Sequence, residues 1–243
     1  MALNSAVLRR MELFAGSDAH ALDDIARLGR TRRIPRGRVI FKRGDEATAC
    51  HALISGRVRI AQAAGQGGDN VVIRYVGPGE IFGAVALFHG GRFPADATAI
   101  TDCVEIWWSA PAMIELIKRY PHIALNALRI VGRRLDELQE RMRELTTEKV
   151  DQRVAHALVR LARQAGIKID HGIEIGFPLS RKDLAAMTGT AHYTVSRILS
   201  DWQARGLIAS ARKRIVVCDL PGLEAVAGAA MLPDPQGKNR PKG

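Results

Sequence analysis

The stretch GTAHYTVSRILSDWQARGLI, which begins at Gly189, combines an apolar face with a polar face that can hydrogen-bond to nucleic acid. Val195, Ile198 and Leu199 recur at helical spacing and are expected to be buried. The outward face is then expected to carry His192, Tyr193, Ser196 and Arg197. An arginine can donate two hydrogen bonds to the edge of a guanine, and a histidine or tyrosine can reach a base edge or a phosphate. This pattern predicts a helix that enters the major groove of DNA.

The residues around this helix predict a helix-turn-helix with a wing. Ser180 can cap the preceding run RKDLAAM, with Asp183 three positions later as its capping-box partner. The small Ala185 allows two helices to cross closely, and Gly189 makes the turn between them. A basic hairpin, LIASARKRIVVCDL, follows and can grip the DNA backbone. The residues expected to contact DNA are Ser180, Thr190, His192, Tyr193, Thr194, Ser196, Arg197, Arg212, Lys213 and Arg214.

The charge balance of the 243 residues agrees with a polyanionic partner. The net charge is +11 and the pI is about 10.2, which favours nucleic acid first and an anionic membrane surface second. No apolar run is long enough to span a membrane, and the first residues lack the order of a secretory signal. Cys50, Cys103 and Cys218 are far apart and form no C-x-x-C pair. We therefore expect a cytoplasmic protein without a cysteine zinc site or an iron–sulfur cluster.

The chain divides into segments with different sequence patterns, and together these patterns predict an α+β fold. From about Ile34 to Trp108, short runs rich in Val, Ile and Phe alternate with glycine turns, as in an antiparallel β-roll of the jelly-roll type. We expect a sensing roll over residues 13–110, a dimerisation helix region over 111–147 and a winged helix-turn-helix domain over 148–221. Residues 222–243 are expected to be a C-terminal extension that is disordered at its end.

An apolar stripe within the helical region steps alternately by three and four residues. Its members are Leu128, Val131, Leu135, Leu138, Met142 and Leu145, and we call them the seam. Such a narrow stripe with charged flanks favours a parallel coiled-coil dimer, and the alternative is a helix packed against its own roll. The seam can also pair with a second helix along one part of its length and pack against the roll along another.

The order of these parts resembles the CRP/FNR family of bacterial transcription regulators. The resemblance covers residues 13–220 and is carried by IPRGRVIFKRGD, the turn from Ile54 to Val58, PGEIFGAVALF and LSRKDLAAMTGTAHYTVSRIL. The helix-turn-helix is the most specific of these matches. The resemblance implies a homodimer that binds a two-fold symmetric site on double-stranded DNA, and that recruits or blocks RNA polymerase when an effector changes its shape.

The sensing pocket departs from the cyclic-AMP-binding members of that family. Those members carry a glutamate after the glycine of G-E-x-x-G and an Arg-Ser/Thr-Ala phosphate cassette; here Ala84 follows Gly83, and Phe93-Pro94-Ala95 occupies the cassette. Cyclic AMP is therefore not the expected effector, although a gap of one residue would bring Arg92 into the cassette. The residues expected to line the effector pocket are Gly83, Ala84, Val85, Arg92, Phe93, Pro94 and Ala95.

The sequence leaves several effectors and functions as alternatives. The pocket is more similar to the branch that responds to nitrogen oxides, redox state or unidentified small molecules, and a haem would need His51 or His89 as its ligand. Tyr193 stands where many redox-responsive members have a glutamate, so a different half-site is expected. A cupin-type metalloenzyme is disfavoured because the roll has only those two separated histidines. The expected protein is thus a regulator rather than an enzyme, and the alternative to effector control is a constitutive DNA-binding protein.

Overall fold

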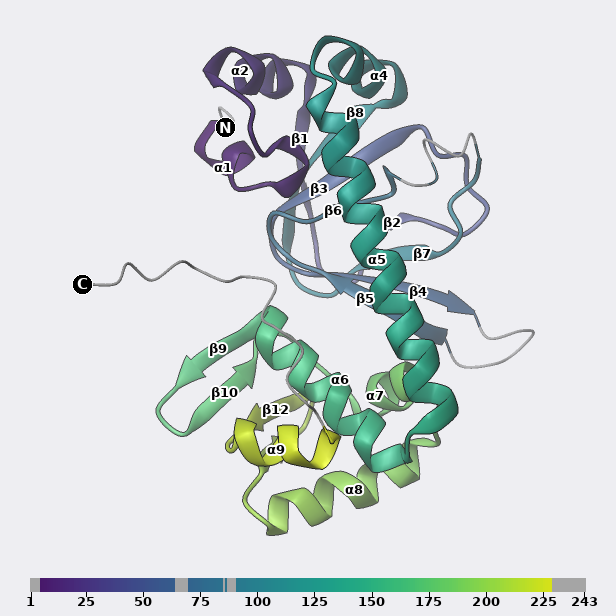
Figure 1. Cartoon of the computed structure of the whole chain (residues 1–243), viewed down its shortest axis with the longest axis vertical. Coiled ribbons are helices and arrows are strands. Elements are labelled where there is room, and N and C mark those ends of the chain that lie inside the picture. The colour runs from purple at the N-terminus through teal and green to yellow at the C-terminus, as the bar shows by residue number, and fades with distance from the viewer. Residues whose placement is uncertain (1–4, 64–69, 85, 87–90, 229–243) are drawn as a thin grey trace.

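The computed structural model describes residues 5–63, 70–84, 86 and 91–228. It has a β-roll at one end, a winged domain at the other and one long helix along both (Figure 1). The expected α+β class is confirmed. Among the described residues no helix is long and apolar enough to cross a membrane.

The roll consists of two four-stranded antiparallel sheets, with the strand orders β1-β8-β3-β6 and β2-β7-β4-β5. The strands are β1 (Arg30–Ile34), β2 (Val39–Phe41), β3 (Ala49–Ser55), β4 (Val58–Ala63), β5 (Asn70–Val76), β6 (Ile81–Phe82), β7 (Asp96–Ala99) and β8 (Cys103–Ser109). Side chains alternate between the two faces of a strand, so Leu53 and Cys103 face the interior of the roll while Ile106 faces outward. The interior core includes Phe41, Phe82 and Phe93.

Helices cover the outer face of the first sheet. They are α1 (Ser5–Arg9), the 3-10 helix η1 (Glu12–Phe14), α2 (Ala19–Leu28) and α4 (Ala110–Arg119). Trp108 is fully buried beneath them, and its indole N–H donates a hydrogen bond of 2.8 Å to the carbonyl of Ile25. Phe14 packs edge-on against the same indole. This second core anchors the N-terminal segment to the roll.

Helix α5 (His122–Thr147) packs against its own roll and leaves the seam open. Near its start Ile123 is fully buried, and the amide of Asn126 donates hydrogen bonds to the carbonyls of Leu13 and Ala15. Further along, Arg141 donates a hydrogen bond to the carbonyl of Ile73 in β5. All six seam residues are exposed in the single chain, with exposed fractions from 45% to 69%. The helix therefore contacts the roll through a different face from the seam.

The winged domain follows a break at Glu148 and Lys149. Its elements are α6 (Val150–Ala165), β9 (Gly166–Ile169), β10 (Gly172–Ile175), α7 (Arg181–Thr188), α8 (His192–Ala204), β11 (Ile208–Ala211), β12 (Arg214–Val217) and α9 (Leu220–Ala227). Its antiparallel sheet has the order β11-β12-β10-β9. Strand β9 and helix α9 were not predicted from the sequence. The expected disorder at the end of the chain concerns residues beyond 228, which lie outside the described residues.

Candidate nucleic-acid interface

Helix α7 begins with the predicted capping box. The Ser180 hydroxyl accepts a hydrogen bond of 3.1 Å from the Asp183 amide and donates one of 2.6 Å to the Asp183 carboxylate, which also accepts the Ser180 amide at 3.0 Å. The cap thus uses the Ser180 side chain that was predicted to contact DNA. Gly189 ends the helix with φ 61° and ψ 42°, the left-handed region that glycine enters without a Cβ penalty.

Helix α8 is held by one face and open on the other. Val195 and Leu199 are fully buried and Trp202 nearly so, whereas Ile198 is only half-buried. Trp202 was missed by sequence reasoning, although it continues the same helical spacing. This face packs against α7 and the sheet, which fixes the direction of every other side chain on the helix.

The predicted DNA-contacting residues of α8 lie on its open side. Tyr193 is 71% exposed, and His192 and Arg197 are also exposed. The His192 ring lies edge-on to the Tyr193 ring, with 6.4 Å between their centroids. Ser196, Thr194 and Thr190 are half-buried, and Thr190 precedes the helix at the turn. The polar groups at the start of the helix are therefore gathered on one accessible surface.

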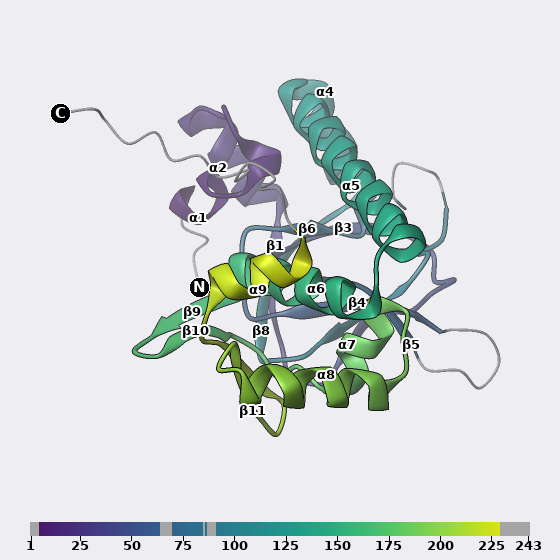
Figure 2. The same cartoon turned by 60° about the horizontal axis from the view of Figure 1, so that its bottom comes forward.

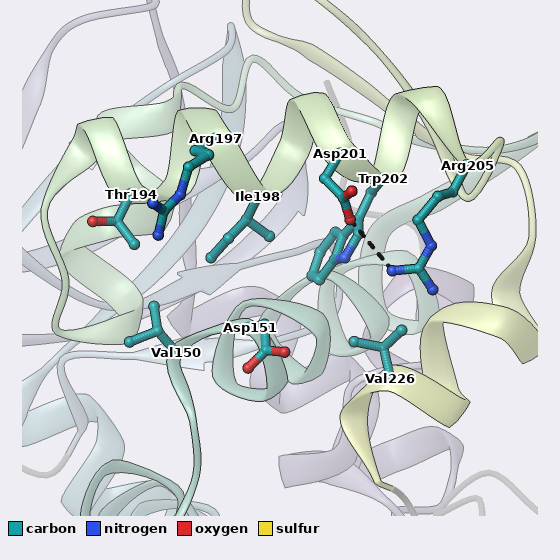
Figure 3. Close-up of a pocket in the computed structure, with 9 residues that line it drawn as sticks. All are labelled: Val150, Asp151, Thr194, Arg197, Ile198, Asp201, Trp202, Arg205 and Val226. Atoms are coloured by element: carbon teal, nitrogen blue, oxygen red, sulfur yellow. Dashed lines mark hydrogen bonds and ion pairs between the residues drawn. The ribbon is translucent and has the colours of Figure 1, made fainter.

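Arg197 also borders an open groove of about 690 Å³ between α8, the start of α6 and α9 (Figure 3). Val150 and Val226 form part of its apolar lining. Val150 lies opposite Thr194 and Arg197, which lie next to each other on α8, and Val226 of α9 lies at the other end of the groove, near Arg205. At the far end of α8, Arg205 forms an ion pair with Asp201, four residues before it. The groove depends on α9, so its shape was not predictable from the helix-turn-helix alone.

The wing residues divide into two kinds. Arg212 and Lys213 are exposed at the β11–β12 turn, where Lys213 has φ 60° and its carbonyl accepts the Leu179 amide at 3.0 Å. Arg214 instead forms a bidentate ion pair with Glu174 of β10, at 2.7 and 2.6 Å. The hydrogen bond from this guanidinium lowers the pKa of Glu174. The wing turn and the start of α7 enclose a second groove, of about 470 Å³, whose rim includes Arg181, Lys182 and Arg212.

The predicted effector-pocket residues do not form a single cluster. Phe93 is buried and stacks on Phe41 with 3.7 Å between ring centroids, whereas Pro94 is exposed. Arg92 is exposed and donates a hydrogen bond of 2.7 Å to the carbonyl of Gly44. Ala84 packs instead with the core beneath the N-terminal helices. Ala95 is buried, and Val85 lies outside the described residues.

Gly83 lies against the aromatic core of the roll. Its φ is +77°, and a Cβ there would come within 3.1 Å of both the His51 and Phe93 rings. A side chain at this position would be strained by the backbone and by these neighbours. Gly83 therefore brings the backbone close to the roll interior.

The roll contains a buried contact among Arg32, Glu105 and His51 that the sequence did not predict. Glu105 is fully buried, with one carboxylate oxygen 2.5 Å from Arg32 Nε and the other 3.4 Å from His51 Nδ1. His51 is 6% exposed and stacks on Phe82. His89, the other predicted haem ligand, lies outside the described residues. Among the residues with described positions, no group of three or more His, Cys, Asp or Glu side chains could hold a metal ion.

Comparisons with known proteins match both ends of the chain. Residues 31–120 match the model of the cyclic nucleotide-binding domain, and residues 152–226 match the Crp-like helix-turn-helix domain. The cyclic AMP receptor protein of Thermus thermophilus is 31% identical, over 88% of this chain and 96% of its own length. The transcriptional activator protein FnrA of Stutzerimonas stutzeri is 29% identical, over 88% and 86%.

Solved structures support the same assignment. A CRP-family transcriptional regulator from Thermus thermophilus has a TM-score of 0.70 and 30% identity, over 82% of this chain and 97% of its own length. By name, FnrA is a transcriptional activator and the protein of this structure is a transcriptional regulator, and neither is an enzyme. With a roll that matches the cyclic nucleotide-binding domain, a long helix and a winged helix-turn-helix in this order, the chain belongs to the CRP/FNR family of transcription regulators.

Proposed function

We propose that this DNA-binding transcription regulator acts as a homodimer on a palindromic operator, under control of a small-molecule, redox or nitrogen-oxide signal other than cyclic AMP. The observation that carries the proposal is the open side of α8, where His192, Tyr193 and Arg197 are exposed while the face that carries Val195, Leu199 and Trp202 is buried. A helix held in this way can enter a major groove without rearranging the domain. RNA polymerase is the further partner, and the site of action is the cytoplasm, with no membrane contact.

The DNA contacts divide by chemistry. Arg197 provides a bidentate donor for a guanine edge, and Tyr193 and His192 reach a base edge or a phosphate. Arg212 and Lys213 of the wing, with Arg181 at the start of α7, provide positive charge for the DNA backbone. In a dimer that joins along the seam, two copies of α8 about 34 Å apart would face successive major grooves of a palindrome of roughly 20 base pairs.

The proposal about the effector rests on the surroundings of residues 92–95, which stand where the cyclic-AMP-binding members have their phosphate cassette. Phe93, in place of a cassette arginine, is buried against Phe41, and Arg92 is hydrogen-bonded to Gly44 on the outside. Neither arrangement offers a guanidinium to a cyclic phosphate in the roll. The relative from Thermus thermophilus is a cyclic AMP receptor by name, and the one from Stutzerimonas stutzeri is a transcriptional activator by name. The alternative is constitutive binding, with no ligand in the roll.

The DNA-reading role is tested with two arginine variants of the same helix. Arg197→Ala removes the predicted base contact, and it should weaken operator binding by about 10- to 100-fold, as expected for the loss of about 1–3 kcal/mol. Arg205→Ala is the matched control, because Arg205 lies past the end of α8 in an ion pair with Asp201. Gel-shift titration at fixed salt measures both. Unchanged operator affinity of Arg197→Ala would overturn the role assigned to α8.

The effector proposal is tested by the affinity of the full chain for its operator. The measurement is made with protein as purified, after exhaustive removal of small molecules, and after addition of cyclic AMP. A change on removal that cyclic AMP does not reverse supports a different effector, and restoration by cyclic AMP overturns that assignment. Equal affinity in all three samples supports the constitutive alternative. Native mass spectrometry of the first sample reports any retained molecule.

A further inference from the structure

Tyr193 is a large exposed side chain that does not belong to the seam. It is 71% exposed, more than any residue of the seam, where the exposed fractions run from 45% to 69%. A second copy of α5 covers the seam in the proposed dimer, whereas Tyr193 belongs to α8, in the winged domain. A single exposed tyrosine is common on protein surfaces. Its position and its neighbours on α8 are therefore what indicate a role.

The position of Tyr193 directs its ring away from the protein. It is the second residue of α8, which Figure 2 shows along the lower edge of the molecule. Tyr193 precedes Val195 by two residues, which corresponds to about 200° around a helix. Val195 is fully buried in the core of the winged domain, so the Tyr193 ring lies nearly opposite the packed face. The ring is thus among the first groups of the protein that meet DNA when the start of α8 enters a major groove.

The neighbours of Tyr193 place its apolar ring beside a donor of hydrogen bonds. The His192 ring lies edge-on to it, with 6.4 Å between the centroids and an interplanar angle of 81°. Arg197 is four residues further along the helix, so its side chain shares that side of α8 with Tyr193. The first turn of α8 contains no acidic residue, and it therefore lacks a carboxylate that could accept a hydrogen bond from the amino group of a cytosine.

The major groove offers one group that matches an exposed aromatic ring. Base pairs present hydrogen-bond acceptors, amino donors and, on thymine alone, a C5 methyl group. The guanidinium of Arg197 is matched by the two acceptors of a guanine. The phenol hydroxyl of Tyr193 can donate or accept a hydrogen bond, so it distinguishes the bases poorly. Contact between the apolar face of the ring and a methyl group removes both from water, and only thymine provides that group.

We propose that Tyr193 is a specificity-determining residue that selects a thymine in each half-site, through contact of its ring with the C5 methyl group. This inference rests on the proposed binding of α8 in the major groove. Four residues of helix, a rise of about 6 Å, separate Tyr193 from Arg197, and base pairs are stacked about 3.4 Å apart. The selected thymine therefore lies within about two base pairs of the guanine that Arg197 contacts. A 5-methylcytosine presents the same methyl group and can replace this thymine.

The first experiment identifies the operator and then removes the methyl group alone. Duplexes are selected from a random pool with the full-length protein as purified, and each selected half-site should contain a thymine within about two base pairs of its guanine. Deoxyuridine then replaces this thymine in both half-sites, which removes the C5 methyl group and retains every hydrogen-bonding group of the base. The affinity of wild type should fall by about 10- to 20-fold, or about fourfold for each half-site. Deoxyuridine at thymines outside the half-sites is the control.

The second experiment assigns the methyl preference to the ring. Tyr193→Phe keeps the ring and should keep the preference for thymine over deoxyuridine. Tyr193→Ala should bind the thymine operator more weakly, and its affinities for the two operators should agree within about twofold. Ile167→Ala is the matched control, because Ile167 is another exposed apolar residue of the winged domain, 57% exposed in β9, and it should match wild type. A preference that is retained in Tyr193→Ala, or lost in Tyr193→Phe or Ile167→Ala, overturns the proposal.

Cytosine methylation tests the same contact in the opposite direction. With the thymine–adenine pair replaced by cytosine–guanine, a C5 methyl group on that cytosine should tighten wild-type binding by about fourfold for each half-site and leave Tyr193→Ala unchanged. Equal affinity of wild type for cytosine and 5-methylcytosine overturns the proposal. A selected palindrome that has no such thymine, or in which deoxyuridine is neutral, overturns this inference and leaves the proposed function intact. If the selection yields no preferred sequence, the proposed function fails and this inference fails with it.

Discussion

Arg212 and Arg214 are both arginines of the wing, two positions apart, but their surroundings differ. Both side chains are exposed, but the Arg214 guanidinium is held by both carboxylate oxygens of Glu174, whereas Arg212 lies at the turn itself. A guanidinium already paired with a carboxylate contributes less positive field to a nearby phosphate than one without such a partner. The two residues are therefore expected to differ in their contribution to DNA binding, although the sequence gives them equal weight.

Arg212→Ala should weaken binding to all DNA sequences and reduce the slope of log affinity against log salt by about 1, because one phosphate contact is lost. Arg214→Ala should leave that slope unchanged. Fluorescence anisotropy over a range of NaCl concentrations measures both slopes with the same duplex. An equal reduction in both variants would mean that DNA displaces Glu174 and recruits Arg214.

Asp24 of α2 joins the N-terminal helices to the end of α4. It accepts hydrogen bonds from Arg27 and from the Tyr120 hydroxyl and lies beside Arg119. These partners, Arg27 first, lower the pKa of the Asp24 carboxyl to about 2. Because the folded-state pKa lies below the unfolded one, ionised Asp24 stabilises the fold above about pH 4, and this stabilisation is lost as the pH falls through about 2.

Asp24→Asn should therefore lower the melting temperature at pH 5 to 7, and its difference from wild type should close as the pH approaches 2. Melting curves at a series of pH values measure this difference. Asp23→Asn is the matched control, since Asp23 is the exposed neighbour on the same helix, and its difference from wild type should be small throughout. A difference between Asp24→Asn and wild type that stays constant down to pH 2 would contradict the role given to the ionised carboxylate.

The elements that the sequence predicted are those whose signals lie close together along the chain. Ser180, Gly189 and Val195 fall within one short stretch, so the cap, the turn and the buried face of the helix-turn-helix could all be predicted. The roll could be predicted for the same reason, because its glycine turns and the short apolar runs between them follow one another closely in the sequence. Helix α9 also had a local signal, because Asp219 caps it and Pro221 stands in its first turn, but the proline-rich end of the chain obscured it.

Contacts between distant segments could not be predicted. Glu105 faces His51 because the register of β3 with β8 pairs Leu53 with Glu105 and His51 with Trp107. No local pattern specifies that register, so a charged residue within a run of apolar ones had no visible partner. The ion pair between Arg59 of β4 and Asp183 of α7 has the same origin, and Asp183 was predicted only as a cap.

At Gly189, between α7 and α8, both the backbone conformation and the packing against Leu145 favour a residue without a side chain. Gly189→Ala should destabilise the fold by about 1–2 kcal/mol, because alanine in the left-handed region is strained and its Cβ would press on Leu145. Gly132→Ala is the control of opposite sign, since Gly132 lies inside α5 with open space around it and alanine favours a helix by about 1 kcal/mol. Urea unfolding of both full-length variants measures the change. Equal stability of Gly189→Ala and wild type would contradict the strain argument.

At the scale of the whole molecule, the seam is a continuous apolar stripe without cover in the single chain. Leu128 and Met142, near its two ends, are 68% and 69% exposed. The other face of α5 is fixed to the roll through Ile123, Asn126 and Arg141, so the helix cannot turn to bury the seam against its own chain. A second copy of α5, with the same spacing, is the partner that the coiled-coil pattern predicts.

Leu135→Glu places a charge in the middle of the seam, and the protein should then have the mass of one 26.5 kDa chain rather than two. Operator affinity should fall by about 10²- to 10⁴-fold, because each winged domain would bind its half-site without the effective concentration that the dimer supplies. Ile114→Glu is the control, since Ile114 is a similarly exposed apolar residue of α4 outside the seam. Light scattering at micromolar concentration gives the mass, and gel shift gives the affinity. A dimeric Leu135→Glu protein would assign the interface to another surface, whereas a monomer with full operator affinity would show that pairing along α5 is not what places the two recognition helices on DNA.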